Sequence, residues 1–128
     1  MTFHFDADAA LILVSAKLIG PDGTTLLSMA LDTGASRTLI NEDVLRSVGY
    51  DPDESEVERV PMTTASTVEP VPQLPVDRIE SLGQHRRNLL VVAYTLPDDL
   101  DFDGLLGLDF LRGLKLNIDF RKGRITVS

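Results

Sequence analysis

Cysteine is absent from this chain of 128 residues, which excludes disulfide bonds, a thiol nucleophile and cysteine-ligated zinc. Basic residues are scarce, because 12 Lys and Arg stand against 20 Asp and Glu and give a formal net charge of −8. Such a balance argues against nucleic-acid binding, which needs a cluster of Lys and Arg. Long apolar runs are also missing: the longest, residues 9–14, is too short to cross a bilayer and follows Asp6 and Asp8 rather than a basic leader. We therefore expect a cytoplasmic protein that binds neither nucleic acid nor membranes.

What the sequence does contain is mostly strand signals, and its length fits one domain over residues 1–128. The turn Gly20-Pro21-Asp22-Gly23 separates two β-prone segments, which predicts a hairpin. Asn41 is placed to cap a helix that ends at Gly49. We therefore expect an all-β fold with one or two short helices. The expected strands cover residues 10–19, 24–31, 38–40, 57–67, 76–82, 88–94, 104–108 and 114–120, with a last strand around residues 125–127.

The most informative motif is Asp32-Thr33-Gly34-Ala35-Ser36, which follows an apolar segment. Asp favours tight turns because its carboxylate accepts hydrogen bonds from nearby backbone N–H groups, and Gly lets another backbone approach closely. A carboxylate so held has one orientation, as a general base requires. An isolated Asp-Thr-Gly more often marks an ordinary β-turn. Here a second apolar segment ends in Leu105-Leu106-Gly107, and the two motifs together favour a catalytic site.

The two motifs, in this order and with a possible hairpin between them, resemble the retropepsin-like aspartic proteases, especially their cellular and bacterial single-domain members. The resemblance covers roughly residues 11–127 and implies a half-barrel protomer in a two-fold homodimer. It implies that Asp32 is catalytic and that Thr33 hydrogen-bonds across the dimer axis. Gly34 and Ala35 are implied to meet the substrate, and Leu105-Leu106-Gly107 to pack beneath the catalytic loop as support.

The activity implied by the resemblance is that of an endopeptidase, which hydrolyses peptide bonds at a dyad formed by Asp32 of two chains. Two close carboxylates share one proton, so the ionised one takes a proton from water while the protonated one polarises the scissile carbonyl. This chemistry needs no metal or cofactor. The implied partners are a second copy of the chain and a protein or peptide substrate. The alternative is a non-catalytic or single-partner processing or assembly module that keeps the fold.

The expected flap departs from the family pattern. Family flaps commonly carry Gly near the tip, but no Gly occurs between Val57 and Leu82. The prolines at positions 70, 72 and 75 cannot donate ladder hydrogen bonds, so we expect them at a sheet edge or in a projecting loop. The flap tip is expected at Thr63, Thr64, Ala65, Ser66 and Thr67.

Arg37 and Asp109 have two interpretations. Viral relatives hold their catalytic loop with an Arg–acid pair, and here the positions of that pair carry Ser36 and Leu108. Arg37 and Asp109, each one residue further on, could form a replacement pair or be two solvated charges. Asp109 could also cap a single helical turn that ends near Gly113.

The acidic segment at residues 98–103 also has a functional and a plain interpretation. Its four Asp residues alternate loosely, as calcium ligands do, but the Gly and the distal Glu of an EF-hand loop are missing. A solvated acidic loop is therefore favoured over a metal site. Asp103 could hydrogen-bond the start of the strand that contains Leu105.

Apolar residues near both ends of the sequence suggest terminal strands. Phe3 and Phe5 alternate with polar residues at one end, as Ile125 and Val127 do at the other. These strands could pair between two chains or form ordinary edge strands of one chain.

Overall fold

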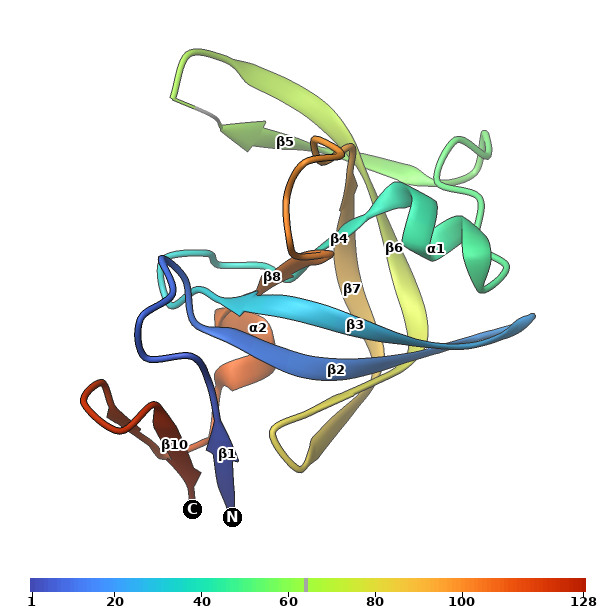
Figure 1. Ribbon diagram of the computed structural model, residues 1–128. Helices are drawn as coiled ribbons and strands as arrows, with labels where there is room; N and C mark the ends of the chain where they lie inside the picture. Colours follow the sequence, from blue (N-terminus) through green and yellow to red (C-terminus); the bar gives the residue numbers. More distant parts are fainter. Residues whose placement is uncertain (64) are drawn as a thin grey trace.

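The computed structural model describes residues 1–63 and 65–128, which fold into ten strands and two short helices (Figure 1). The expected all-β fold with one or two short helices is confirmed. The larger sheet contains β2 (Leu13–Gly20), β3 (Gly23–Leu31), β4 (Leu39–Asn41), β5 (Glu58–Thr63), β6 (Val68–Ser81), β7 (Gln84–Tyr94) and β8 (Gly104–Leu106). The smaller sheet contains β1 (Thr2–His4), β9 (Leu116–Asp119) and β10 (Arg124–Val127), and the helices are α1 (Glu42–Ser47) and α2 (Leu108–Leu111). None of the helices in the described residues is long and apolar enough to span a membrane.

The larger sheet has the strand order β2-β3-β8-β4-β7-β6-β5 and closes on itself, because β2 also pairs with β6. Strands β2 and β3 form the predicted hairpin, in which Gly20 pairs with Gly23 across a two-residue turn. The closed sheet encloses an apolar core. Its largest fully buried side chains include Leu18, Met29, Ile40, Leu106 and Phe110.

Helix α1 begins where its sequence predicts. The side chain of Asn41 accepts a hydrogen bond from the backbone N–H of Asp43 at 3.2 Å, which satisfies one of the free donors of the first turn. Leu45 and Val48 are buried against the barrel. The helix therefore follows from local capping together with a short apolar face.

Strand β6 contains the three prolines and pairs with different strands along its length. Residues 68–73 pair with β5, residues 73–81 with β7, and residues 78–81 with β2. Pro61 and Pro70 face each other across the β5–β6 hairpin, which Figure 1 shows projecting from the barrel. The prediction of a projecting segment is thus confirmed for Pro70, while Pro75 lies where β6 has only one strand partner.

Tyr50 takes the place of a second strand partner at residues 74–77 of β6. Its hydroxyl accepts a hydrogen bond from the backbone N–H of Asp77 at 2.7 Å and donates one to the Asp77 carboxylate at 2.9 Å. Burial raises the pKa of Tyr50 to about 12, so the hydroxyl stays protonated at neutral pH. The segment after α1 is in this way attached to the barrel.

The turn between β6 and β7 differs from the prediction. We expected strands at residues 76–82 and 88–94, but β7 begins at Gln84 and the turn consists of Leu82 and Gly83. Both have positive φ, 53° and 71°, as in the tight type I′ hairpin turn. Leu82 tolerates this conformation because its side chain is buried in the core.

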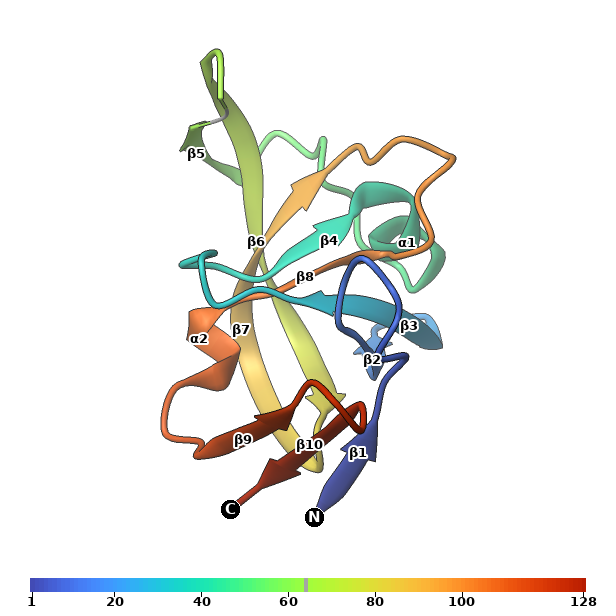
Figure 2. The same cartoon turned by 60° about the vertical axis from the view of Figure 1, so that its left-hand side comes forward.

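The two ends of the chain pair with each other. In the smaller sheet, of order β1-β10-β9, Phe3 pairs with Ile125 of the same chain, and the backbone N–H of Phe5 donates to Gly123. These residues thus act as ordinary strands within one chain. Figure 2 shows this sheet at the end of the molecule opposite the β5–β6 hairpin.

Candidate active site

The two sequence motifs lie side by side because β8 is inserted between β3 and β4. Strand β8 runs parallel to β3, with Leu105 beside Ala30, and antiparallel to β4, with Leu105 beside Leu39. The loop from β3 to β4 carries Asp32, and the backbone N–H of Asp32 donates to the carbonyl of Leu106 at 3.0 Å. The end of β8 therefore supports the start of this loop directly.

Asp32 is held by its own turn. The backbone N–H of Gly34 donates to Oδ1 of Asp32 at 2.8 Å, and the N–H of Ala35 donates to the Asp32 carbonyl at 3.2 Å. The Asp32 side chain is half-buried, while Thr33 and Gly34 are exposed at the tip of the loop. Oδ2 accepts no hydrogen bond from a described residue, so one carboxylate oxygen is fixed and the other can meet a reactant.

Gly107 lets the second motif approach the loop closely. A Cβ atom at this position would lie 2.7 Å from the carbonyl oxygen of Arg37 and 2.9 Å from that of Ala35. The next backbone N–H, that of Leu108, donates to the Ala35 carbonyl at 2.8 Å. Only glycine leaves room for this contact, so position 107 fixes the distance between the loop and α2.

Asp109 does not pair with Arg37, so the interpretation of the two residues as a replacement ion pair is wrong. Its carboxylate accepts hydrogen bonds from the backbone N–H of Thr38 at 2.9 and 3.0 Å and from the Thr38 hydroxyl at 2.7 Å. It also accepts one from the N–H of Phe110 at 2.8 Å. Nor does Asp109 cap α2, since Gly107 occupies the N-cap and makes no side-chain cap bond. The carboxylate instead joins the helix to the end of the Asp32 loop.

The Thr38 hydroxyl is the centre of this support, because it donates to Asp109 and accepts from the N–H of Gly107 at 3.2 Å. Thr38 is completely buried. We expect Thr38→Val to lower the free energy of unfolding by about 2 kcal/mol, because it removes two hydrogen bonds and leaves the buried N–H of Gly107 without its partner. Urea denaturation measures this loss.

Thr126→Val is the matched control, since Thr126 is exposed on β10 and the substitution should change the unfolding free energy by less than about 0.5 kcal/mol. Equal unfolding free energies for the wild type and Thr38→Val would show that the hydroxyl does not stabilise the loop.

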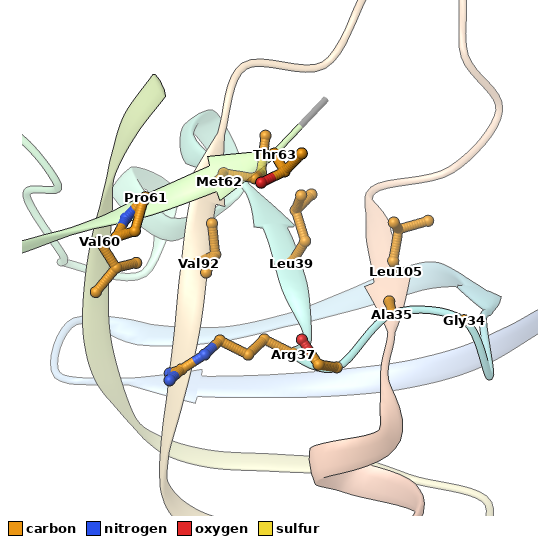
Figure 3. Close-up of a pocket in the computed structure, with 11 residues that line it drawn as sticks. Gly34, Ala35, Arg37, Leu39, Val60, Pro61, Met62, Thr63, Val92 and Leu105 are labelled. Carbon is orange, nitrogen blue, oxygen red and sulfur yellow. The ribbon is translucent and has the colours of Figure 1, made fainter. Parts of the chain in front are cut away.

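A pocket of about 570 Å³ opens beside the loop, beneath the β5–β6 hairpin. Figure 3 shows Met62 and Thr63 of β5 over Leu39, with Ala35 and Leu105 on the side away from Val60. The pocket is therefore a cleft between the Asp32 loop and the hairpin. It is lined by Gly34, Ala35, Ser36, Arg37, Leu39, Val60, Pro61, Met62, Thr63, Val92 and Leu105.

The structure brings some of the predicted site residues to this pocket and keeps others away from it. Gly34, Ala35 and Leu105 line it, whereas Leu106 and Gly107 are buried beneath the loop. Of the predicted flap tip, Thr63 lines the pocket, residues 65–67 are exposed beyond it, and Thr64 lies outside the described residues.

Apart from Thr63, the wall that β5 and β7 contribute to the pocket was not predicted from the sequence. Val60 and Met62 are half-buried, while Arg59, Pro61 and Thr63 between and beside them are exposed. In the sequence, Val60 and Met62 are two positions apart, as on one face of a strand, but Pro61 between them interrupts the alternation of apolar and polar residues. Val92 carried no such signal, since it lies in a continuous buried run of β7.

Asp103 belongs to the framework of the site. Its carboxylate accepts a hydrogen bond from the N–H of Ser28 at 2.9 Å, and its own N–H donates to the Ser28 carbonyl at 2.7 Å. Asp103 thus holds β3 and not the start of its own strand, which was the possibility that the sequence offered. Among the described residues, no three His, Cys, Asp or Glu side chains are grouped so that they could hold a metal ion.

Comparisons with known proteins agree with this geometry. A family model described as aspartyl protease matches residues 14–110, which is most of the chain. A solved structure of a retropepsin-like aspartic protease from Rickettsia conorii is similar in fold, with a TM-score of 0.70 and 19% sequence identity. The alignment covers 99% of this chain and 88% of that one. No curated protein sequence matches the chain. With its Asp-Thr-Gly loop, its inserted Leu-Leu-Gly strand and a family match over most of its length, the chain belongs to the aspartyl protease family and has the retropepsin-like fold.

Proposed function

We propose that the protein is an aspartic endopeptidase that acts as a two-fold homodimer, in which Asp32 of each chain supplies one carboxylate. The observation that carries this proposal is the placement of Asp32. Its carboxylate is oriented by the N–H of Gly34 at 2.8 Å, on a loop that lines a cleft of about 570 Å³. Asp32 itself does not line the cleft, but Gly34 and Ala35 of the same turn do, which puts the fixed carboxylate at the edge of the cleft. General acid–base hydrolysis requires a carboxylate held in one orientation.

The homodimer follows from the number of carboxylates. The sequence holds a single Asp-Thr-Gly, and the dyad mechanism needs two. Thr33 and Gly34 are exposed at the tip of the loop, so this surface is free to meet the same surface of a second chain. A two-fold axis through that contact brings like residues together, as in other isologous dimers.

In the proposed reaction, the two Asp32 carboxylates share one proton and act on a bound water. The ionised carboxylate removes a proton from the water as it attacks the scissile carbonyl, and the protonated one donates a hydrogen bond to the carbonyl oxygen. The substrate lies in the cleft between the loop and β5. Apolar side chains of the substrate fit the walls formed by Leu39, Val60 and Val92.

Incubation of the purified chain with a mixture of denatured proteins, with and without pepstatin, tests the proposal. We expect pepstatin-sensitive cleavage by a species that sedimentation shows to be a dimer. Hydrolysis by a chain that remains monomeric at every active concentration would contradict the shared site. A stable dimer that cleaves nothing in the mixture would favour the alternative, a single-partner or non-catalytic module.

A further inference from the structure

A second pocket, of about 580 Å³, adjoins the catalytic cleft. Ser36 and Arg37 line both pockets, so the surface is continuous from the catalytic loop to residues 86–90 of β7. A peptide that lies extended in the first pocket can therefore continue past Arg37 into the second pocket. The second pocket is lined by Ser36, Arg37, Arg86, Arg87, Asn88, Leu89, Leu90 and Asp109.

Arginine dominates the charge of this second pocket, although the whole chain has a net charge of −8. Arg86 is occupied, because its Nη2 and Nε donate to the Phe110 carbonyl at 2.8 and 3.2 Å and its guanidinium lies 5.0 Å from the Phe110 ring centroid. Arg37 and Arg87 are exposed, and neither forms an ion pair with a described residue. Two guanidinium groups therefore remain available to a ligand.

The single carboxylate of the pocket does not neutralise these two arginines. Asp109 brings one negative charge against the positive charges of Arg37, Arg86 and Arg87, so the pocket stays positive. Its carboxylate is bound by the backbone and hydroxyl of Thr38 and by the N–H of Phe110, and not by an arginine. The pocket also has an apolar part, formed by Leu89 and by Leu90, which is 43% exposed. Its chemistry suits a side chain with a short apolar stem and a carboxylate at the end.

We propose that this second pocket, named here the arginine pocket, binds a Glu or Asp side chain of the peptide substrate on one side of the scissile bond. The proposal rests on the proposed function, because it takes the first pocket as the path of the substrate. Arg37 and Arg87 then determine specificity, since a planar guanidinium pairs with a carboxylate through two parallel hydrogen bonds.

Sequencing the peptides released from a denatured protein mixture tests this specificity. For the wild type we expect Glu and Asp to be enriched about fivefold over Gln and Asn at one fixed position from the cleaved bond. Arg37→Gln/Arg87→Gln should abolish the enrichment. Arg121→Gln, which removes one positive charge from an exposed turn far from the cleft, should retain it. Cleavage without an acidic preference, or a preference unchanged in the double variant, would overturn the proposal.

A binding measurement separates this proposal from the proposed function. Asp32→Asn protein is titrated with a fluorescein-labelled pool of random octapeptides rich in Glu, and with the matched pool in which Gln replaces Glu. We expect the Glu pool to bind about fivefold more tightly, with the difference lost in the double variant and in about 1 M salt. This result, found in a protein that cleaves nothing, would support the arginine pocket while the protease assignment fails. Equal or absent binding of the two pools would refute the arginine pocket even if the wild type cleaves peptides.

Discussion

Asp32→Asn is expected to lower kcat/KM for peptide hydrolysis by at least about 1000-fold, while the fold stays intact. The amide can neither ionise nor share a proton, so the water is no longer activated. Its oxygen can still accept the hydrogen bond that Gly34 donates to Oδ1 of Asp32. The turn therefore keeps its shape, and the loss is chemical. Initial rates on a cleaved peptide, together with a urea unfolding curve, measure the two effects separately.

Asp98→Asn provides the control for Asp32→Asn, because Asp98 is exposed in the loop between β7 and β8 and the substitution changes charge by the same amount. We expect its activity to match that of the wild type. Activity of Asp32→Asn within about tenfold of the wild type would remove Asp32 from the reaction and would contradict the protease assignment.

The second large effect is expected from Gly104→Ala, which should lower the free energy of unfolding by about 3 kcal/mol. Gly104 is buried in β8, which lies between β3 and β4. A Cβ atom there would overlap the carbonyl oxygen of Leu39 and lie 3.1 Å from the Cα of Ile40. These atoms are backbone, so a side-chain rotation cannot relieve the clash. Chemical denaturation measures the loss.

Gly113→Ala is the control for Gly104→Ala, because it adds a Cβ atom where there is no steric clash and only a positive φ opposes the substitution. Gly113 has φ of +84°, but no heavy atom lies within 4 Å of the position that a Cβ would take. Alanine there carries only the strain of a positive φ, about 1 kcal/mol. If Gly104→Ala unfolds no more easily than Gly113→Ala, the close approach of β8 to β4 does not limit stability.

Local chemistry explains which parts of the fold could be predicted. The Gly20–Gly23 turn, the Asn41 cap and the Asp32 turn each depend on residues within three positions of one another. Such contacts form from propensity and side-chain hydrogen bonding alone, so the sequence indicates them directly. The all-β class follows in the same way from the alternation of apolar and polar residues.

Contacts between distant residues could not be predicted from local chemistry, and the packing of Leu106 beneath the Asp32 loop was expected only from the family resemblance. Thr38 and Asp109 are 71 positions apart, and the sequence offered Asp109 only an ion pair with Arg37, a place in solvent or a helix cap. The positive φ of Leu82 is unfavourable by itself and is tolerated because the side chain is buried in the barrel. In each case tertiary packing decides between local alternatives, and a single sequence contains no record of it.

Strand β6 has a consequence for the dynamics of the cleft. Its first part is held only by β5 in the projecting hairpin, whereas its last part lies between β7 and β2 in the closed barrel. Amide protons of one continuous strand thus belong to two cooperative units of different local stability. We therefore expect the hairpin to open in hydrogen exchange without the barrel, with the boundary between the two units at residues 74–77, where one edge of β6 has no strand partner.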